Sequence, residues 1–146
     1  MREVMSCGIL LFRAKPACAF LLLRHPDRFD LPKGHREPGE SELDTALREF
    51  EEETGIAAEH IRVDPDFRYE LTYRPRYKRF GGERLSKTVV IFLAWLVAGD
   101  AQVDPSEHED FAWIRWPCAR RFREPAIAGV LDATVDHFAG DFPHDQ

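Results

Sequence analysis

The sequence predicts an α/β protein, with a mixed β-sheet between helices in an α/β/α sandwich. Three observations lead to this prediction. Five short segments carry the apolar patterns of strands, and one of them, residues 88–97, is almost continuously apolar, as in a central strand covered on both faces. Two longer segments, residues 42–54 and 125–138, have apolar side chains at helical spacing. These helices alternate with and flank the strands, which favours helices packed on a mixed sheet.

The predicted strands follow one another along the chain. Residues 7–13 and 19–24 are short apolar runs separated by a proline-containing turn, which indicates a pair of strands. Residues 31–40 are expected to be a loop. Large apolar residues alternate with polar ones over residues 67–73, the period of a half-buried strand. A hairpin then leads to the central strand, and residues 112–116 are expected to form another short strand.

The first predicted helix has signals at both ends. Ser41 followed by Asp44 has the form of a capping box, and Gly55 lies where a left-handed C-terminal cap would fall. We therefore expect this helix over residues 42–54. The second helix, residues 125–138, is expected to pack its apolar side chains in the core.

Length, composition and charge limit the classes of protein. With 146 residues, 44% of them hydrophobic, the chain is expected to form a single domain over residues 1–146. Its formal net charge of −6 argues against a general nucleic-acid or membrane-surface binder. Cys7, Cys18 and Cys118 form no CxxC pair, so a cytoplasmic protein without disulfides or structural zinc is expected. No apolar run approaches the roughly 20 residues of a membrane span, and a signal-peptide core is not seen.

Four glutamates crowd the C-terminal half of the first predicted helix, where electrostatics disfavours them. Acids near a helix C-terminus cost about 0.3 to 1 kcal/mol each, and like charges three or four residues apart add roughly 0.2 to 0.5 kcal/mol per pair. At about 100° per residue, Glu49, Glu52 and Glu53 share one face. Glu51 lies on another face and is expected to be a solvated surface charge. A bound cation would offset the repulsion among the other three.

The spacing of these acids belongs to a longer pattern. The pattern begins with a glycine in the predicted loop and ends at the cap of the helix. Its positions are Gly34, Glu40, Arg48, Glu49, Phe50, Glu52, Glu53, Gly55 and Ile56. It resembles the motif of the Nudix hydrolases over its full length. The resemblance implies the Nudix fold and an enzyme that hydrolyses a nucleoside diphosphate linked to another group, using a divalent cation held by the glutamates.

The resemblance also implies roles for individual residues. Glu49, Glu52 and Glu53 would hold Mg²⁺ or Mn²⁺, because carboxylate oxygens are the hard ligands that these ions prefer. Gly34 would let a backbone carbonyl approach the metal. The catalytic group would be Glu49, Glu52 and Arg48, with one glutamate as the base and Arg48 orienting a glutamate rather than touching substrate. Glu40, the first glutamate of the motif, is expected to brace the loop that precedes the helix.

Other segments resemble one branch of the family, the asymmetric diadenosine tetraphosphate hydrolases. These segments are CGILLF, AFLLLRH, LPKGHREPGE, SKTVVIFLAW and SEHEDFAWI. Carried over by position, the residues that meet substrate phosphates would be Lys33, Lys87 and either Tyr77 or Tyr73, with His35 as a further candidate. Phe29 would stack on a base. The acid after the last long strand, a further metal ligand, would be Glu107, with Glu109 as the alternative.

The hairpin of residues 73–87 is unusually basic. It holds six Lys or Arg residues against the single acid Glu83, a balance of +6 − 1 = +5, which leaves −6 − 5 = −11 for the rest of the chain. A basic loop on so acidic a protein predicts contacts with the phosphates of a substrate, with Lys87 nearest to them.

Three functions are compatible with these observations. The first is a hydrolase of diadenosine tetraphosphate and related dinucleoside polyphosphates, which would release ATP and AMP. The second is another Nudix pyrophosphohydrolase, acting on RNA 5′-triphosphate ends, nucleoside triphosphates or diphosphoinositol polyphosphates. The third is a non-catalytic binding module, which the complete set of motif acids argues against. The expected partner is a nucleotide substrate bound by a monomer, without a membrane or a stable nucleic-acid partner.

Overall fold

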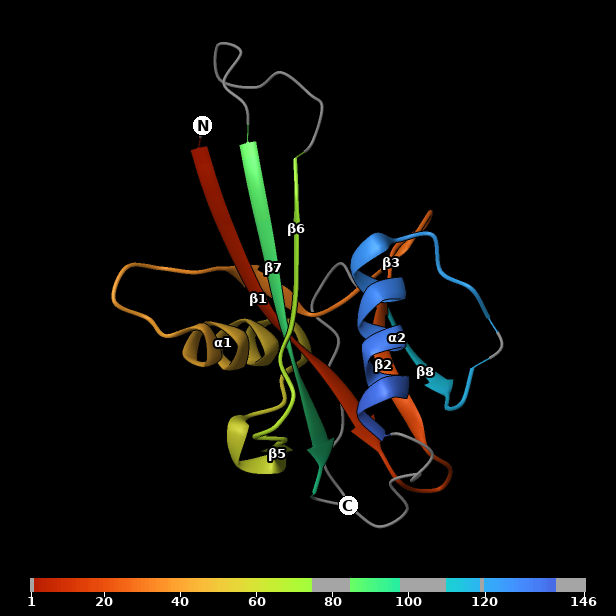
Figure 1. The fold of residues 1–146 in the computed structure, drawn as a ribbon. Helices are drawn as coiled ribbons and strands as arrows, with labels where there is room; N and C mark the ends of the chain where they lie inside the picture. The colour runs from red at the N-terminus through yellow and green to blue at the C-terminus, as the bar shows by residue number, and fades with distance from the viewer. Residues whose placement is uncertain (1, 75–84, 98–109, 119, 139–146) are drawn as a thin grey trace.

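The computed structural model describes residues 2–74, 85–97, 110–118 and 120–138 (Figure 1). The strands are β1 (Arg2–Arg13), β2 (Ala19–Arg24), β3 (Phe29–Asp30), β4 (Lys33–His35), β5 (Ile61–Val63), β6 (Tyr69–Tyr73), β7 (Leu85–Leu96) and β8 (Asp110–Arg115). The helices are α1 (Glu42–Thr54), the short 3₁₀ helix η1 (Ala58–His60) and α2 (Pro125–Phe138). Both α-helices have the bounds that the sequence predicts. None of the helices in these segments is long and apolar enough to span a membrane.

The described strands form one mixed sheet. Its main path runs in the order β3, β2, β1, β7, β5, and three further strands attach to this path: β4 pairs with β1, β6 with β7, and β8 with β2. The long strands β1 and β7 run parallel, whereas the other pairs are antiparallel. The central strand predicted over residues 88–97 is β7, which has a partner along each edge.

The two α-helices cover opposite faces of this sheet (Figure 1). The core on the α1 side contains Cys7, Ile9, Leu11, Leu21, Ala46, Phe50 and Val90. The core on the α2 side contains Leu10, Phe12, Phe20, Leu22, Val89, Ile91, Ile127 and Val130. Consecutive residues of β1 enter the two cores in turn, because neighbouring side chains of a strand point to opposite faces. The predicted α/β/α sandwich with a mixed sheet is confirmed.

Tertiary pairing changes several predicted boundaries. β1 begins at Arg2, five residues earlier than predicted, because its first part pairs with the start of β7. The segment predicted as a loop over residues 31–40 contains β4, which pairs with β1 over three residues. β5 and η1 were not predicted, since segments of three residues carry no readable periodicity.

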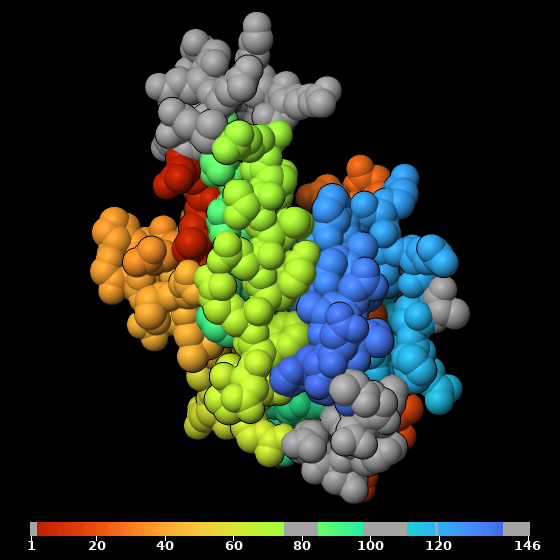
Figure 2. Space-filling view, in the orientation of Figure 1, coloured from red at the N-terminus to blue at the C-terminus, as the bar shows by residue number. Residues whose placement is uncertain are grey.

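Strand β6 lies along the outer surface beside α2 (Figure 2). The Tyr69 hydroxyl meets the α2 backbone at Gly129 so closely that a Cβ at this position would overlap it. A glycine in the helix therefore lets β6 and α2 approach each other, which closes one side of the α2 core.

Candidate active site

Helix α1, which carries the clustered glutamates, is fixed at both ends by its caps. The Ser41 hydroxyl accepts a hydrogen bond from the Asp44 backbone N–H at 3.0 Å. Gly55 adopts the left-handed conformation, with φ of 79°, and its N–H donates to the Glu51 carbonyl at 2.8 Å. Both predicted caps are confirmed. No basic residue lies in the last turn of α1. The negative charge of its glutamates is therefore balanced by residues outside that turn.

Arg48 supplies part of this balance. Its Nη1 donates to Glu49 Oε2 at 2.8 Å and lies 3.4 Å from Glu52 Oε1. Its Nε donates to Glu40 Oε2 at 2.7 Å, and its Nη2 donates to Glu40 Oε1 and to the His35 carbonyl oxygen at 3.0 and 3.1 Å. One planar guanidinium thus joins the helix, the preceding loop and strand β4. These contacts fit a residue that orients carboxylates rather than one that binds substrate.

Glu40 anchors the loop that precedes α1. Besides its pair with Arg48, its Oε1 accepts hydrogen bonds from the Glu37 backbone N–H at 3.0 Å and from the Thr45 hydroxyl at 2.9 Å. The hydrogen bond from Arg48, followed by that from the Glu37 backbone, lowers the pKa of Glu40 to about 2. The carboxylate therefore stays ionised at neutral pH and holds the loop against the helix.

Strand β4 docks directly on the acidic face of α1. The backbone of Gly34 touches the Glu49 carboxylate so closely that a Cβ at position 34 would overlap it. One residue earlier, the Lys33 backbone N–H donates to Glu53 Oε1 at 2.9 Å. The glycine of the motif is therefore needed here for the close packing of Glu49 on β4, a reason that the sequence does not reveal.

The three glutamates offer the donor chemistry that a divalent cation needs. Their carboxylate oxygens are hard ligands of the kind that Mg²⁺ and Mn²⁺ prefer. In the part of the chain that the structure describes, no three acidic, His or Cys side chains converge closely enough to hold a metal by themselves. Mg²⁺ is usually held by one or two carboxylates, with substrate phosphates and waters filling its remaining positions. The residues present thus fit a cation that binds together with a phosphate substrate.

Two of the predicted substrate-binding residues are neighbours on β4. Pairing with β1 places Lys33 beside Gly8 and His35 beside Ser6. Ser6, Gly8 and Leu10 alternate along β1 on the same side, and Leu10 lies in the α2 core. The side chains of Lys33 and His35 therefore belong to the face of the sheet that α2 covers further along.

Two further candidates, on β6 and β7, lie on the same face. Tyr73 on β6 pairs with Lys87 on β7, and Val89, two residues further along β7, lies in the α2 core. Because paired residues of neighbouring strands share a face, Tyr73 and Lys87 point to the side of the sheet that also carries Lys33. The structure thus brings together, on one face, residues that are some 50 positions apart in the sequence.

These candidates differ in their surroundings. Lys33 is largely buried, and its Nζ donates to Asp30 Oδ1 at 2.8 Å. The side chain of His35 is exposed. Tyr73 is exposed over 40% of its surface, and Lys87 is half-buried. Asp30 was not predicted as part of the site; its spacing of three residues from Lys33 was the available signal.

Phe29 has closer neighbours than expected for a platform that stacks on a base. The Arg120 guanidinium lies over its ring, 4.5 Å from the centroid, and the ring of Phe122 meets it edge-on at 5.6 Å. The Phe29 backbone N–H donates to Glu124 Oε2 at 2.8 Å. None of these three partners was predicted from the sequence, although the basic run from Arg120 to Arg123 is a visible signal.

Tyr77, Glu107 and Glu109 lie outside the residues that the structure describes. The same is true of residues 75–84, the central part of the basic hairpin. The ladder between β6 and β7 ends at the pair Tyr73 and Lys87, which are the first and last residues of that hairpin. The role of the basic hairpin and the assignment of Glu107 or Glu109 as a further metal ligand therefore stay predictions.

Comparison with known proteins identifies the family. The family model described as NUDIX domain matches residues 3–132, which is most of the chain. The chain belongs to the Nudix family. As a Nudix hydrolase it acts on phosphoric anhydride bonds, and enzymes of this family generally need divalent metal ions. The resemblance seen in the motif is confirmed.

Several relatives of this Nudix chain are known. The asymmetrical bis(5′-nucleosyl)-tetraphosphatase of Rattus norvegicus is 38% identical over 120 residues, which cover 75% of this chain and 77% of the rat protein. An RNA pyrophosphohydrolase of Erythrobacter litoralis is 30% identical over 119 residues, covering 75% of this chain and 73% of its own length. A crystal structure of a C. elegans Ap4A hydrolase binary complex superposes with a TM-score of 0.75 at 30% identity, covering 95% of this chain and 99% of that one.

Proposed function

We propose that this Nudix hydrolase cleaves diadenosine tetraphosphate and related dinucleoside polyphosphates asymmetrically, to ATP and AMP, with Mg²⁺ or Mn²⁺. The observation that carries the proposal is the arrangement of β4, whose backbone touches Glu49 and Glu53 while its side chains Lys33 and His35 share a face with Lys87. Acidic side chains suited to a cation thus pack on one face of β4, and cationic side chains suited to a phosphate chain project from its other face, which supports the proposal. The names of the rat and C. elegans relatives favour the same substrate class.

In this proposal, the residues of the motif have separate roles. Glu49, Glu52 and Glu53 hold the cation, with the Gly34 carbonyl as a further ligand, and Glu49 or Glu52 accepts a proton from the attacking water. Arg48 keeps Glu49 and Glu52 together. A bound cation would neutralise charge on the phosphates and make a water molecule more acidic.

The phosphate chain is held by the cationic face of the sheet. Lys33, His35 and Lys87 meet phosphate oxygens, with Tyr73 or Tyr77 as an additional donor, and Glu107 completes the metal group. The Lys33 ammonium would exchange or share its bond to Asp30 when a phosphate arrives, since a charge-assisted bond to phosphate is at least as strong. We further propose that the enzyme works as a monomer in the cytoplasm.

The RNA pyrophosphohydrolase relative favours a second candidate, the release of pyrophosphate from RNA 5′ ends. The two functions are separated by incubating the protein with diadenosine tetraphosphate and with triphosphorylated RNA, with Mg²⁺ or Mn²⁺, and identifying the products by ion-exchange chromatography. ATP and AMP in equal amounts are expected from the first substrate. Two ADP molecules would contradict the asymmetric cut. No turnover of the dinucleotide together with rapid release of pyrophosphate from RNA would establish the second candidate instead.

A further inference from the structure

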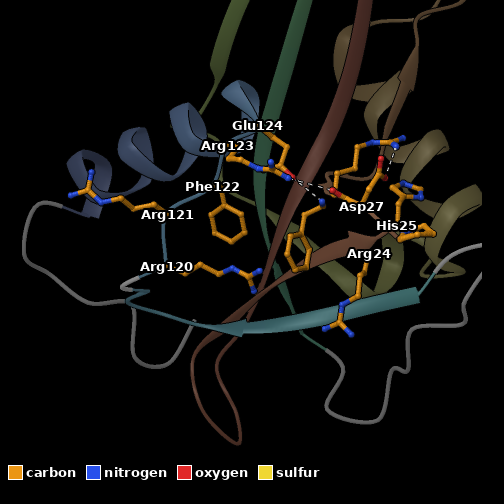
Figure 3. A pocket seen from close by; sticks show the side chains of 11 residues that line it. Arg24, His25, Asp27, Arg120, Arg121, Phe122, Arg123 and Glu124 are labelled. Atoms are coloured by element: carbon orange, nitrogen blue, oxygen red, sulfur yellow. Dashed lines mark hydrogen bonds and ion pairs between the residues drawn. The ribbon is translucent and has the colours of Figure 1, made fainter.

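A cavity of about 390 Å³ lies between the turn that joins β2 to β3 and the segment that leads into α2 (Figure 3). Five arginines line it, namely Arg24, Arg28, Arg120, Arg121 and Arg123. Phe29 and Phe122 lie between them, and Asp27 and Glu124 are the acids in the lining. We call this cavity the arginine pocket. Only Phe29 among its residues was assigned a role above.

The arginine pocket is positively charged on an acidic protein. Its five arginines and two acids give +5 − 2 = +3, against a formal net charge of −6 for the whole chain. Asp27 lies 3.5 Å from Arg28, and the Glu124 carboxylate accepts the backbone N–H of Phe29. Within the described residues, no carboxylate forms an ion pair with the other four arginines. Like charges gathered without partners favour an anionic ligand.

Three of the guanidinium groups contact aromatic rings or backbone, and among the described residues no acid pairs with them. Arg120 lies 4.5 Å from the ring centroid of Phe29 and 5.5 Å from that of Phe122. Arg24 lies 5.9 Å from the Phe29 centroid, and Arg123 Nη2 lies 3.5 Å from the Asp27 carbonyl oxygen. Cation–π contacts orient a guanidinium without neutralising its charge. The charge therefore stays available to a ligand, while the Phe29 face predicted to stack on a base is occupied by Arg120.

We propose that the arginine pocket binds the phosphate groups of a polyphosphate ligand, with Arg120 and Arg123 as the principal donors and Phe29 and Phe122 holding Arg120 in place. Guanidinium groups match phosphate oxygens in two-pronged hydrogen bonds. Helix α2 begins beside the pocket, where the Ala128 N–H donates to the Glu124 carbonyl, and its N-terminal end adds positive potential.

Two sources could supply these phosphates. One is the phosphate chain of the substrate itself, because Phe29 packs against the α2 core and so lies on the same face of the sheet as Lys33. The other is a separate polyphosphate that acts as an effector. The chemistry of recognition is the same for both, and the kinetic experiment below separates them.

The binding test uses inorganic tripolyphosphate as probe, titrated calorimetrically into the full chain in metal-free buffer at low ionic strength. The double variant Arg120→Gln/Arg123→Gln should raise Kd by at least about 30-fold, since each lost charge-assisted contact is worth roughly a factor of ten. The matched control is Arg115→Gln, which removes the same charge from an exposed position on β8 outside the lining of the pocket. It should change Kd less than about threefold. The three arginines concerned are exposed, and thermal unfolding checks that the variants fold.

Three results would overturn the proposal. The first is a wild-type protein that does not bind tripolyphosphate, and the second is a double variant that binds it as well as the control does. The third concerns adenosine, which has a base and no phosphate and should not bind. Adenosine binding that is lost in Phe29→Leu, together with a tripolyphosphate affinity that does not depend on Arg120 and Arg123, would make the pocket a base site instead.

Steady-state kinetics then identify the source of the phosphates. If the double variant raises KM for diadenosine tetraphosphate while kcat is kept, the pocket holds the substrate's own chain. If KM is unchanged and tripolyphosphate alters kcat of the wild type but not of the double variant, the pocket binds a separate effector. Both outcomes support the pocket as a phosphate site. Absence of any dinucleotide turnover would count against the proposed function and leave the calorimetric result to decide this inference.

Discussion

Adjacent glutamates on α1 have different surroundings. The Glu52 side chain is 59% exposed, and its one partner among the described residues is Arg48, at a long distance of 3.4 Å. Glu53, by contrast, accepts the Lys33 backbone N–H at 2.9 Å. Both are metal ligands in the proposed function, but only Glu53 also ties β4 to the helix. Effects on stability and on catalysis can therefore be separated at these two positions.

We expect Glu52→Gln to lower kcat by at least about 10³-fold. The free energy of unfolding without metal should stay unchanged or rise by a few tenths of a kcal/mol, because one repelling charge near the helix C-terminus is removed. Glu53→Gln should lower kcat similarly and cost up to about 1 kcal/mol of stability, since its charge-assisted bond to β4 is weakened. Urea unfolding in metal-free buffer and initial rates with metal measure both effects. Glu51→Gln, an exposed acid on another face, is the control. A Glu52→Gln protein that is clearly less stable and fully active would mean that this acid is structural.

The pKa of Glu40 makes a prediction about pH. Because the pKa in the folded protein, about 2, lies below the ordinary value of 4.5, this carboxylate stabilises the fold above about pH 4.5 and loses that contribution as the pH falls through 2. Glu40→Gln should therefore be less stable than the wild type at pH 7, with a gap that closes between pH 4.5 and 2. Urea unfolding of both proteins at pH 7, 4 and 2.5 measures the gap. A gap that does not change with pH would show that the charge of Glu40 is not what holds Arg48.

At the scale of elements, short stretches at the ends of strands decide which candidate residues share a face of the sheet. β4 has only three residues, but each makes a separate contribution. Gly34 packs on Glu49, and the Lys33 backbone N–H donates to Glu53. The side chains of Lys33 and His35 share one face of the sheet. The parallel ladder between β1 and β7 brings Lys87 to the same face from a distant part of the chain. In the proposed function, the phosphate contacts would thus depend on the register of β4 and β7 against β1.

Lys87 tests the contribution of the second ladder. We expect Lys87→Ala to reduce kcat/KM for diadenosine tetraphosphate by roughly 10- to 100-fold, about 1.4 to 2.7 kcal/mol, because a cation facing the phosphate chain is lost. Replacing Arg76, Lys78 and Arg79 together should mainly raise KM, and the wild-type KM should rise with salt. Arg62→Ala, an exposed cation on β5, serves as control. Wild-type values of kcat/KM for both sets at low ionic strength would show that the hairpin does not hold phosphates.

For the molecule as a whole, stability depends on two cores separated by one sheet. Phe50 of α1 and Phe12 of β1 are fully buried on opposite faces. Each core contributes apolar burial that the other cannot replace. The glutamates of the candidate site lie on the α1 side of the sheet, whereas Lys33, Lys87 and the arginine pocket lie on the α2 side.

We expect Phe50→Ala and Phe12→Ala each to lower the free energy of unfolding by about 3 to 5 kcal/mol, because each leaves a cavity in a closely packed core. Val135→Ala on α2, which is 56% exposed, should change it by less than about 0.5 kcal/mol. Denaturant unfolding measures all three. A loss near 1 kcal/mol for either Phe would mean that the core on its side is loosely packed and adds little to the fold.

The sequence by itself determined the features that depend on local spacing. Both α-helices, the two caps of α1, the division of its acids between faces and the family follow from residues close together in the chain, since helical periodicity and caps act over a few positions. The central strand was also predictable, because a strand covered on both faces is apolar throughout.

Only the tertiary structure decided which distant residues meet. β4 and β5 exist because β1 and β7 offer them edges, not because three residues prefer to be extended. The reason for Gly34, the pairing of Lys33 with Asp30 and the placement of Arg120 over Phe29 each depend on contacts between separate elements. Packing and pairing energies of this kind arise between segments that the chain brings together only on folding, so no local pattern encodes them.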